Sequence, residues 1–173
     1  MAGSLIKIDE EIVSSPTGSV TLGASDWDNS YNVYMVTFKN VVPSTDATNL
    51  RVRFTVSGTP DSSSNYDRAF KTLKTDASFS NTSSTNQTEL LIGNIGTGTS
   101  ESFNGVLYLF NFNNASEYSF CTLEVSALDL TPVLKGGQGG AVLTVAQATD
   151  GVKFATTSGN IASGTFTLYG LKK

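Results

Sequence analysis

The stretch DGVKFATTSGNIASGTFTLYGL, residues 150–171, predicts that this part of the chain forms paired β-strands. Asp150-Gly151 lies between the apolar runs 142–145 and 152–154. Only residues that tolerate a positive φ fit a two-residue hairpin turn, so this dipeptide predicts a hairpin that joins the two runs. A second turn signal, Ser-Gly-Asn, then precedes a longer strand over 161–171.

The strand predicted at the end of this stretch carries apolar side chains on both faces. Phe166 and Leu168 fall on one face, and the other face carries Ile161, Tyr169 and Leu171. A strand that is apolar on two sides is typical of a position near the middle of a sheet.

Composition favours strands over helices. The 173 residues are enough for one domain, spanning 1–173, that buries roughly 70% of the surface exposed by the unfolded chain. Only 15% of the residues are charged, while the chain contains 16 Gly and 4 Pro. A surface built from Ser, Thr and Asn instead of Lys and Glu suits short strands and turns.

Further runs show strand patterns of different kinds. Residues 50–57 alternate between apolar and polar, which predicts one face in the core and one in solvent. Residues 31–38 and 103–112 are apolar on both parities, which predicts central strands covered on two sides. Residues 66–73 fit a strand or a short helix, and the β-rich context favours a strand.

Turn-rich segments separate these runs. Residues 58–65 and 75–88 are predicted to be loops, the second an exposed tip of the kind where recognition often occurs. The glycine-rich segment 136–140 is predicted to be a flexible loop, and it lacks the Lys-Ser/Thr ending and the helix of a phosphate-binding loop. About nine to eleven strands predict an all-β, antiparallel β-sandwich that is jelly-roll-like, with essentially no helix.

Acidic side chains are concentrated near the N-terminus. Residues 1–30 contain one basic and five acidic side chains, whereas the rest of the chain is balanced and the formal net charge is −4. One interpretation is solubility. The other is that the segment 1–15 docks onto a basic partner surface through Asp9, Glu10 and Glu11.

Arg51 and Arg53 stand side by side on the predicted solvent face of 50–57. A solvated face explains them, and the alternative is a contact with an acidic neighbour, such as the N-terminal segment of another copy. They complete the predicted partner-binding set. Because the sequence has no basic stripe, we do not expect it to bind nucleic acid.

The residue types exclude several kinds of chemistry. The chain has no His and one Cys, so Ser-His-Asp and Cys-His catalysis cannot form within one copy and the usual zinc ligands are missing. Cys121 is predicted to be a small buried residue without a disulfide partner. We expect no enzyme activity, no catalytic residue, no metal and no cofactor. No window approaches a membrane span and no signal region opens the chain, so synthesis in a cytoplasm without membrane insertion is expected.

Asp26, Trp27 and Asp28 place two carboxylates beside the sole tryptophan. The simplest interpretation is a polar loop around a partly buried indole. The alternative is a loop that binds a sugar or a calcium ion, because oxygen-rich loops suit hard cations. A lone acidic pair is thin support for a glycoside hydrolase.

The segment SGNIASGTFTLYGLK at 158–172 resembles β-rich virion proteins of tailed bacteriophages, particularly marine ones. GVLYLFN at 105–111 and GVKF at 151–154 support the resemblance, and YNVYMV at 31–36 and STDATN at 44–49 fit the same pattern. The resemblance covers most of the chain from about residue 19 onward and marks a fold more than a role.

The resemblance implies a structural role on a virus particle and carries over no catalytic residues. We expect a capsid decoration or cement protein that binds the major capsid protein, or a tail protein, and packs as a homo-oligomer in the virion. The second apolar faces of 31–38 and 161–171 would then be buried between copies or against the shell. The alternative is a tail-fibre or receptor-binding module that recognises a host surface glycan through the loop of Trp27 and the tip at 75–88.

Overall fold

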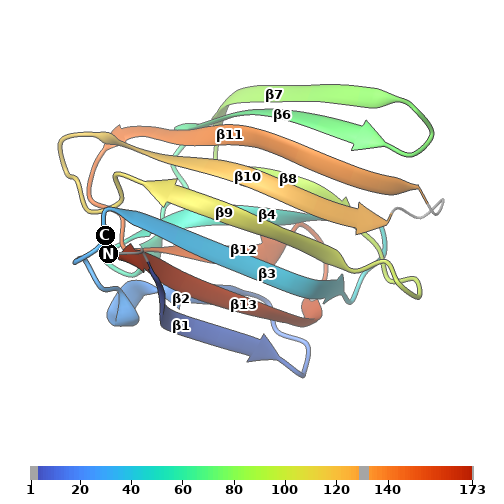
Figure 1. Cartoon of the computed structure of the whole chain (residues 1–173), viewed down its shortest axis with the longest axis horizontal. Helices are drawn as coiled ribbons and strands as arrows, with labels where there is room; N and C mark the ends of the chain where they lie inside the picture. The colour runs from blue at the N-terminus through green and yellow to red at the C-terminus, as the bar shows by residue number, and fades with distance from the viewer. Residues whose placement is uncertain (1–3, 129–132, 173) are drawn as a thin grey trace.

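The computed structural model describes residues 4–128 and 133–172 and contains two antiparallel sheets packed face to face (Figure 1). The larger sheet has eight strands, in the order β1 (Ser4–Val13), β13 (Ile161–Lys172), β3 (Val33–Pro43), β9 (Phe103–Phe110), β10 (Tyr118–Leu128), β11 (Leu134–Ala146), β6 (Tyr66–Lys74) and β7 (Phe79–Gln87). The smaller sheet has five, in the order β2 (Val20–Gly23), β12 (Gly151–Thr156), β4 (Thr48–Val56) and β5 (Thr59–Pro60), with β8 (Leu90–Ile95) also paired to β4. Within these ranges, helical structure is limited to η1 (Ala24–Asp26), a single 3-10 turn.

The predicted antiparallel sandwich with essentially no helix is confirmed, and residues 66–73 form the predicted strand, β6. The described strands number 13, more than expected, because β5 and β7 form in segments predicted to be loops. Ser, Thr and Asn favour turns, but in β7 they occupy an edge strand that is exposed on nearly every residue. Because neither face of β7 is buried, its sequence shows no apolar alternation, and the strand is stabilised by its backbone pairing with β6.

The hairpin predicted at Asp150-Gly151 is wrong. β11 and β12 belong to different sheets, so residues 147–150 carry the chain across the sandwich instead of turning it back. The Asp150 carboxylate accepts hydrogen bonds from the Thr55 hydroxyl at 2.6 Å and from the Gly58 amide at 2.8 Å. These bonds tie the crossing to the end of β4, and Thr55 is buried instead of facing solvent.

β13 is paired on both sides, with β1 and β3, but it is second from the edge of the larger sheet and not near the middle, where the prediction placed it. Phe166 and Leu168 are fully buried on one face, and Leu171 is exposed on the other. Ile161 differs from the prediction, since it is buried. Irregular pairing with β3 on either side of Ser163 interrupts the alternation and turns Ile161 inward.

Aromatic rings fill the space between the two sheets. Phe154 of the smaller sheet packs against Phe38 and Phe166 of the larger sheet, with ring centroids 5.6 and 5.0 Å away. Phe54 of β4 packs against Phe112, with centroids 4.7 Å apart. Offset and tilted pairs at these separations add to the stabilisation from burial alone.

Glycines within the strands make room for aromatic rings on neighbouring strands. Gly105 pairs with Phe38, and a Cβ on Gly105 would lie 2.5 Å from that ring. Gly139 pairs with Phe70, and a Cβ there would lie 2.2 Å from the ring. Such pairs help to fix strand register. The segment 136–140, predicted to be a flexible loop, is thus part of a paired strand, β11.

Cys121 is buried on β10, as predicted, and this burial raises the pKa of its thiol to about 12. The thiolate is the reactive species, so we expect the reagent DTNB to leave the folded protein unlabelled near neutral pH. After unfolding in guanidinium chloride, the same thiol should react fully. Rapid labelling of the folded protein would contradict this placement.

Candidate binding sites

The outer face of the larger sheet carries an unusual share of apolar side chains. An antiparallel sheet with one face in water normally presents polar residues there. On this face the strand registers instead place most of the exposed large hydrophobic residues: Leu5, Ile12, Leu73, Phe79, Tyr108, Phe120, Leu134 and Leu171. Where such residues are contiguous, they make the face a candidate interaction surface.

β1 forms one edge of this sheet and carries the acidic cluster predicted to dock (Figure 1). Alternation along the strand places Asp9 and Glu11 on one face and Glu10 on the other. The Asp9 carboxylate accepts a hydrogen bond from the backbone amide of Gly23 at 2.9 Å, which ties β1 to β2. Residues 1–3 of the predicted docking segment lie outside the described residues.

Glu10 and Glu11 remain exposed. A hydrogen bond from Lys7, and to a smaller extent one from Thr167, lowers the pKa of Glu10. Its carboxylate is therefore charged at neutral pH. On the outer face of the same strand, Leu5 is 46% exposed and Ile12 is 66% exposed. We call Leu5, Glu10, Glu11 and Ile12 together the β1 edge surface.

Arg51 and Arg53 lie side by side on β4, as predicted, but the acid that they contact belongs to the same chain. Both guanidinium groups bind Oε2 of Glu89, at 3.0 Å for Arg51 and 2.9 Å for Arg53. Lys153 of β12 pairs directly with Arg53 in the ladder, and with both arginines it lines a hollow of about 280 Å³. The structure does not bring these arginines near the acidic residues of its own β1, which pairs with the other sheet.

The loop of Trp27 is held by contacts within the chain. The indole lies 4.0 Å from the Tyr34 ring and donates a hydrogen bond to the Asn113 side chain at 2.6 Å. Hydrogen bonds from Ser30 lower the pKa of Asp28, while Asp26 is exposed. The indole is half-buried, as in the simpler interpretation of this loop.

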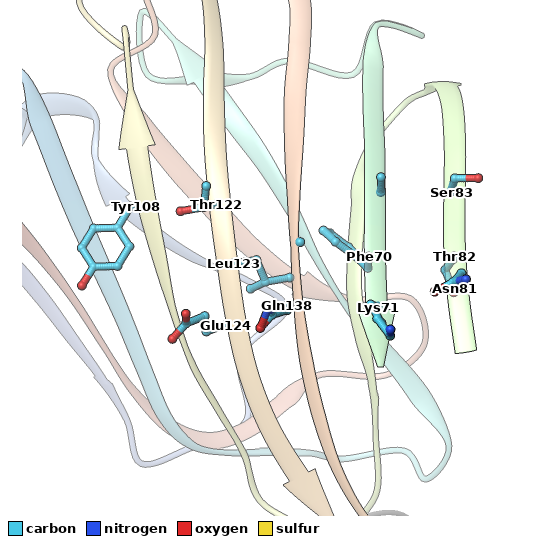
Figure 2. A pocket seen from close by; sticks show the side chains of 12 residues that line it. Phe70, Lys71, Asn81, Thr82, Ser83, Tyr108, Thr122, Leu123, Glu124 and Gln138 are labelled. Carbon is cyan, nitrogen blue, oxygen red and sulfur yellow. The ribbon is translucent and has the colours of Figure 1, made fainter. Parts of the chain in front are cut away.

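A groove that sequence reasoning missed crosses the other half of the outer face, and Figure 2 shows part of its lining. It consists of two hollows of about 690 and 720 Å³. Both hollows are lined by Ala69, Ser83 and Thr122, so they form one continuous depression across β9, β10, β11, β6 and β7. We call it the β11 groove.

The sequence of β11 explains why the surface is hollow there. Its outer-face positions paired with both β10 and β6 are Gly136, Gln138, Gly140 and Val142, so two of the four have no side chain. The adjacent residue on β6 is Ala69, which is also small. The signal was present in the sequence as glycines at alternating positions, but it has this meaning only if the segment is a strand.

Within 4–128 and 133–172, no three or more acidic or cysteine side chains gather as a metal ion would need. No helix in those ranges is long and apolar enough to cross a membrane. No protein-family model, curated protein or solved structure matches the chain. Its class is therefore defined by the fold, which is an all-β sandwich of two open antiparallel sheets.

Proposed function

We propose that this protein is a structural component of a phage particle, a capsid decoration or cement protein that attaches by protein–protein binding to the major capsid protein. The observation that carries the proposal is the β1 edge surface. β1 pairs with β13 alone among the described strands, and it presents exposed apolar and acidic residues together. The resemblance of the 158–172 segment to virion proteins supplies the setting.

An edge of this kind is costly for a protein that stays alone in solution. An unpaired edge strand exposes backbone donors and acceptors, and natural proteins usually protect it with charge, proline or a covering element. β1 has charge at Glu10 and Glu11, but Leu5 and Ile12 add exposed apolar area beside them. A partner that is apolar with a basic rim would satisfy both kinds of residue.

Repetition on the particle would strengthen a modest contact. A shell presents many identical sites, and copies bound side by side can also contact one another as a homo-oligomer. Arg51, Arg53 and Lys153 lie on the outer face of the smaller sheet, where they are available to an acidic neighbour despite the ion pairs with Glu89. The role requires no catalytic group.

The direct test is the protein's copy number on purified particles, measured by quantitative mass spectrometry relative to the major shell protein. A copy number comparable with that of the shell protein supports decoration. A small count that matches the tail symmetry would favour the alternative of a tail-fibre or receptor-binding component, and absence from particles would overturn the virion role.

The site of attachment is tested with paired serine variants. Leu5→Ser combined with Ile12→Ser should weaken binding to particles about tenfold or more, because burial of each large apolar side chain contributes on the order of 1–3 kcal/mol. Both residues are exposed in the free protein, so the fold should persist. Occupancy on particles after mixing and sedimentation is the measurement.

Leu73→Ser combined with Phe79→Ser is the matched control, because these residues are 57% and 62% exposed on the two strands nearest the opposite edge of the same sheet. The control should keep full occupancy. Glu10→Gln combined with Glu11→Gln should weaken attachment a few-fold, and less so at high salt. If the control pair loses occupancy and the β1 pair does not, attachment occurs elsewhere.

A further inference from the structure

We propose that the β11 groove binds a neutral carbohydrate chain. This inference goes beyond attachment, since it assigns a second ligand to a part of the outer face far from the β1 edge surface. The groove lies toward the β7 edge of the larger sheet, and β1 forms the other edge (Figure 1). A particle contact confined to the β1 edge would not cover the groove.

The floor of the groove lacks a side chain at a position where the fold would tolerate one. A Cβ on Gly140, which lines the second hollow, would meet only the Cys121 carbonyl oxygen, at 3.7 Å. Gly140 does not have the positive φ that excludes other residues. By contrast, Gly139 on the inner face is required, since a Cβ there would collide with the backbone of β6. Gly140, on the outer face, keeps the second hollow open.

The rim combines aromatic surface with polar groups that the protein leaves without partners. Tyr108 and Phe120 are 38% and 43% exposed and line the two hollows. Among the described residues, the side chains of Glu124, Gln138 and Asn81 form no hydrogen bond or ion pair with the protein. All three line the first hollow, and Figure 2 shows Glu124 and Gln138 on neighbouring strands with Asn81 across the groove.

This combination matches the surface of a sugar. Carboxylate and amide oxygens accept hydrogen bonds from the hydroxyl groups of a sugar. The amide NH2 groups also donate hydrogen bonds to those hydroxyls. Exposed aromatic rings offer an apolar face against which the C–H face of a pyranose can pack, as apolar ligand surface packs in other binding sites. A long open groove suits a linked chain of sugars better than a single one.

The same features disfavour other occupants. An extended peptide binds best where it can complete a backbone ladder, but β11 is already paired on both sides, with β10 and β6. A polyanion would meet the carboxylates of Glu124 and Asp67. The ammonium group of Lys71 lies 4.8 Å from the Phe79 ring centroid and is the one cation that lines the first hollow.

The test uses the purified, full-length protein without particles, so its outcome is independent of attachment. A printed panel of neutral glucans, mannans, galactans and xylans is probed first, and any hit is measured by isothermal titration calorimetry. We expect binding to at least one of these probes. Gly140→Leu should fill the groove floor and weaken that binding about tenfold or more, and Glu124→Ala should weaken it as well.

Matched controls separate the groove from the rest of the surface. Thr37→Leu adds a leucine to the same outer face on β3, outside the groove, and should leave binding unchanged. Asp26→Ala tests the tryptophan loop and should also have no effect. Thermal unfolding verifies that each variant is folded. No binding across the panel, or binding that survives Gly140→Leu, would overturn the proposal, as would loss only with Asp26→Ala.

Discussion

Replacing Phe154 with alanine should lower the free energy of unfolding by about 3–5 kcal/mol, the range typical of a large aromatic residue removed from a core. Phe154 has no exposed surface, and its ring packs against Phe38 and Phe166 of the opposite sheet. The loss therefore removes contact between the two sheets and leaves a cavity at their interface. Guanidinium chloride unfolding, followed by tyrosine and tryptophan fluorescence, measures the change.

Phe79→Ala is the control for this substitution, because the same side chain is removed from an exposed position at the end of β7. It should change stability by less than about 0.5 kcal/mol. If Phe154→Ala cost no more than Phe79→Ala, the two sheets would not be joined by this aromatic cluster. A change in the slope of the unfolding transition would instead indicate an altered unfolded or native state.

Adjacent glycines on β11 should respond in opposite ways to the same substitution. Gly139→Ala should destabilise the protein by about 3 kcal/mol, because the new methyl group would lie 2.2 Å from both the Ala69 carbonyl oxygen and the Phe70 ring. The strands would have to move apart. Gly140→Ala should be neutral or stabilising by up to about 1 kcal/mol, since the methyl has room and the unfolded chain loses freedom.

The comparison is made by denaturant unfolding of both variants under identical conditions. Its value is that composition and hydrophobicity change equally in the two proteins, so only the face of the strand differs. Equal destabilisation would mean that the outer position of Gly140 is closed, and the β11 groove would lose its open floor. A tolerated Gly139→Ala would contradict the pairing of β11 with β6.

Sequence patterns predicted best those elements whose alternation reflects burial on one side. Residues 50–57 formed a strand in the predicted place, because apolar side chains at every second position have one way to be buried. The hairpin predicted at Asp150-Gly151 was wrong because the same dipeptide also occurs where the chain crosses from one sheet to the other. Its carboxylate binds Thr55 and Gly58, which lie far away in sequence.

The candidate sites were less predictable, because they depend on which strands become neighbours. The β11 groove needs residues from β6, β7, β9, β10 and β11, and that order appears only once the sheet is assembled. Likewise, Glu89 neutralises part of the charge of Arg51 and Arg53 across a distance in sequence that no local pattern reveals. The sequence located the acidic residues of β1, but it could not predict that the Asp9 carboxylate accepts a hydrogen bond from the Gly23 amide.

The position of β13 also dictates when this protein can finish folding during synthesis. β1 and β3 are translated early, yet the strand that separates them in the sheet is the last one described. A ribosome delivers the chain from its N-terminus, so β1 has to wait, without its hydrogen-bonding neighbour, until Ile161–Lys172 has left the exit tunnel. Pairing over such a long sequence separation is slow. The nascent chain therefore completes its larger sheet only after translation of that strand, and the exposed apolar side chains of β1 are a target for chaperones in the interval.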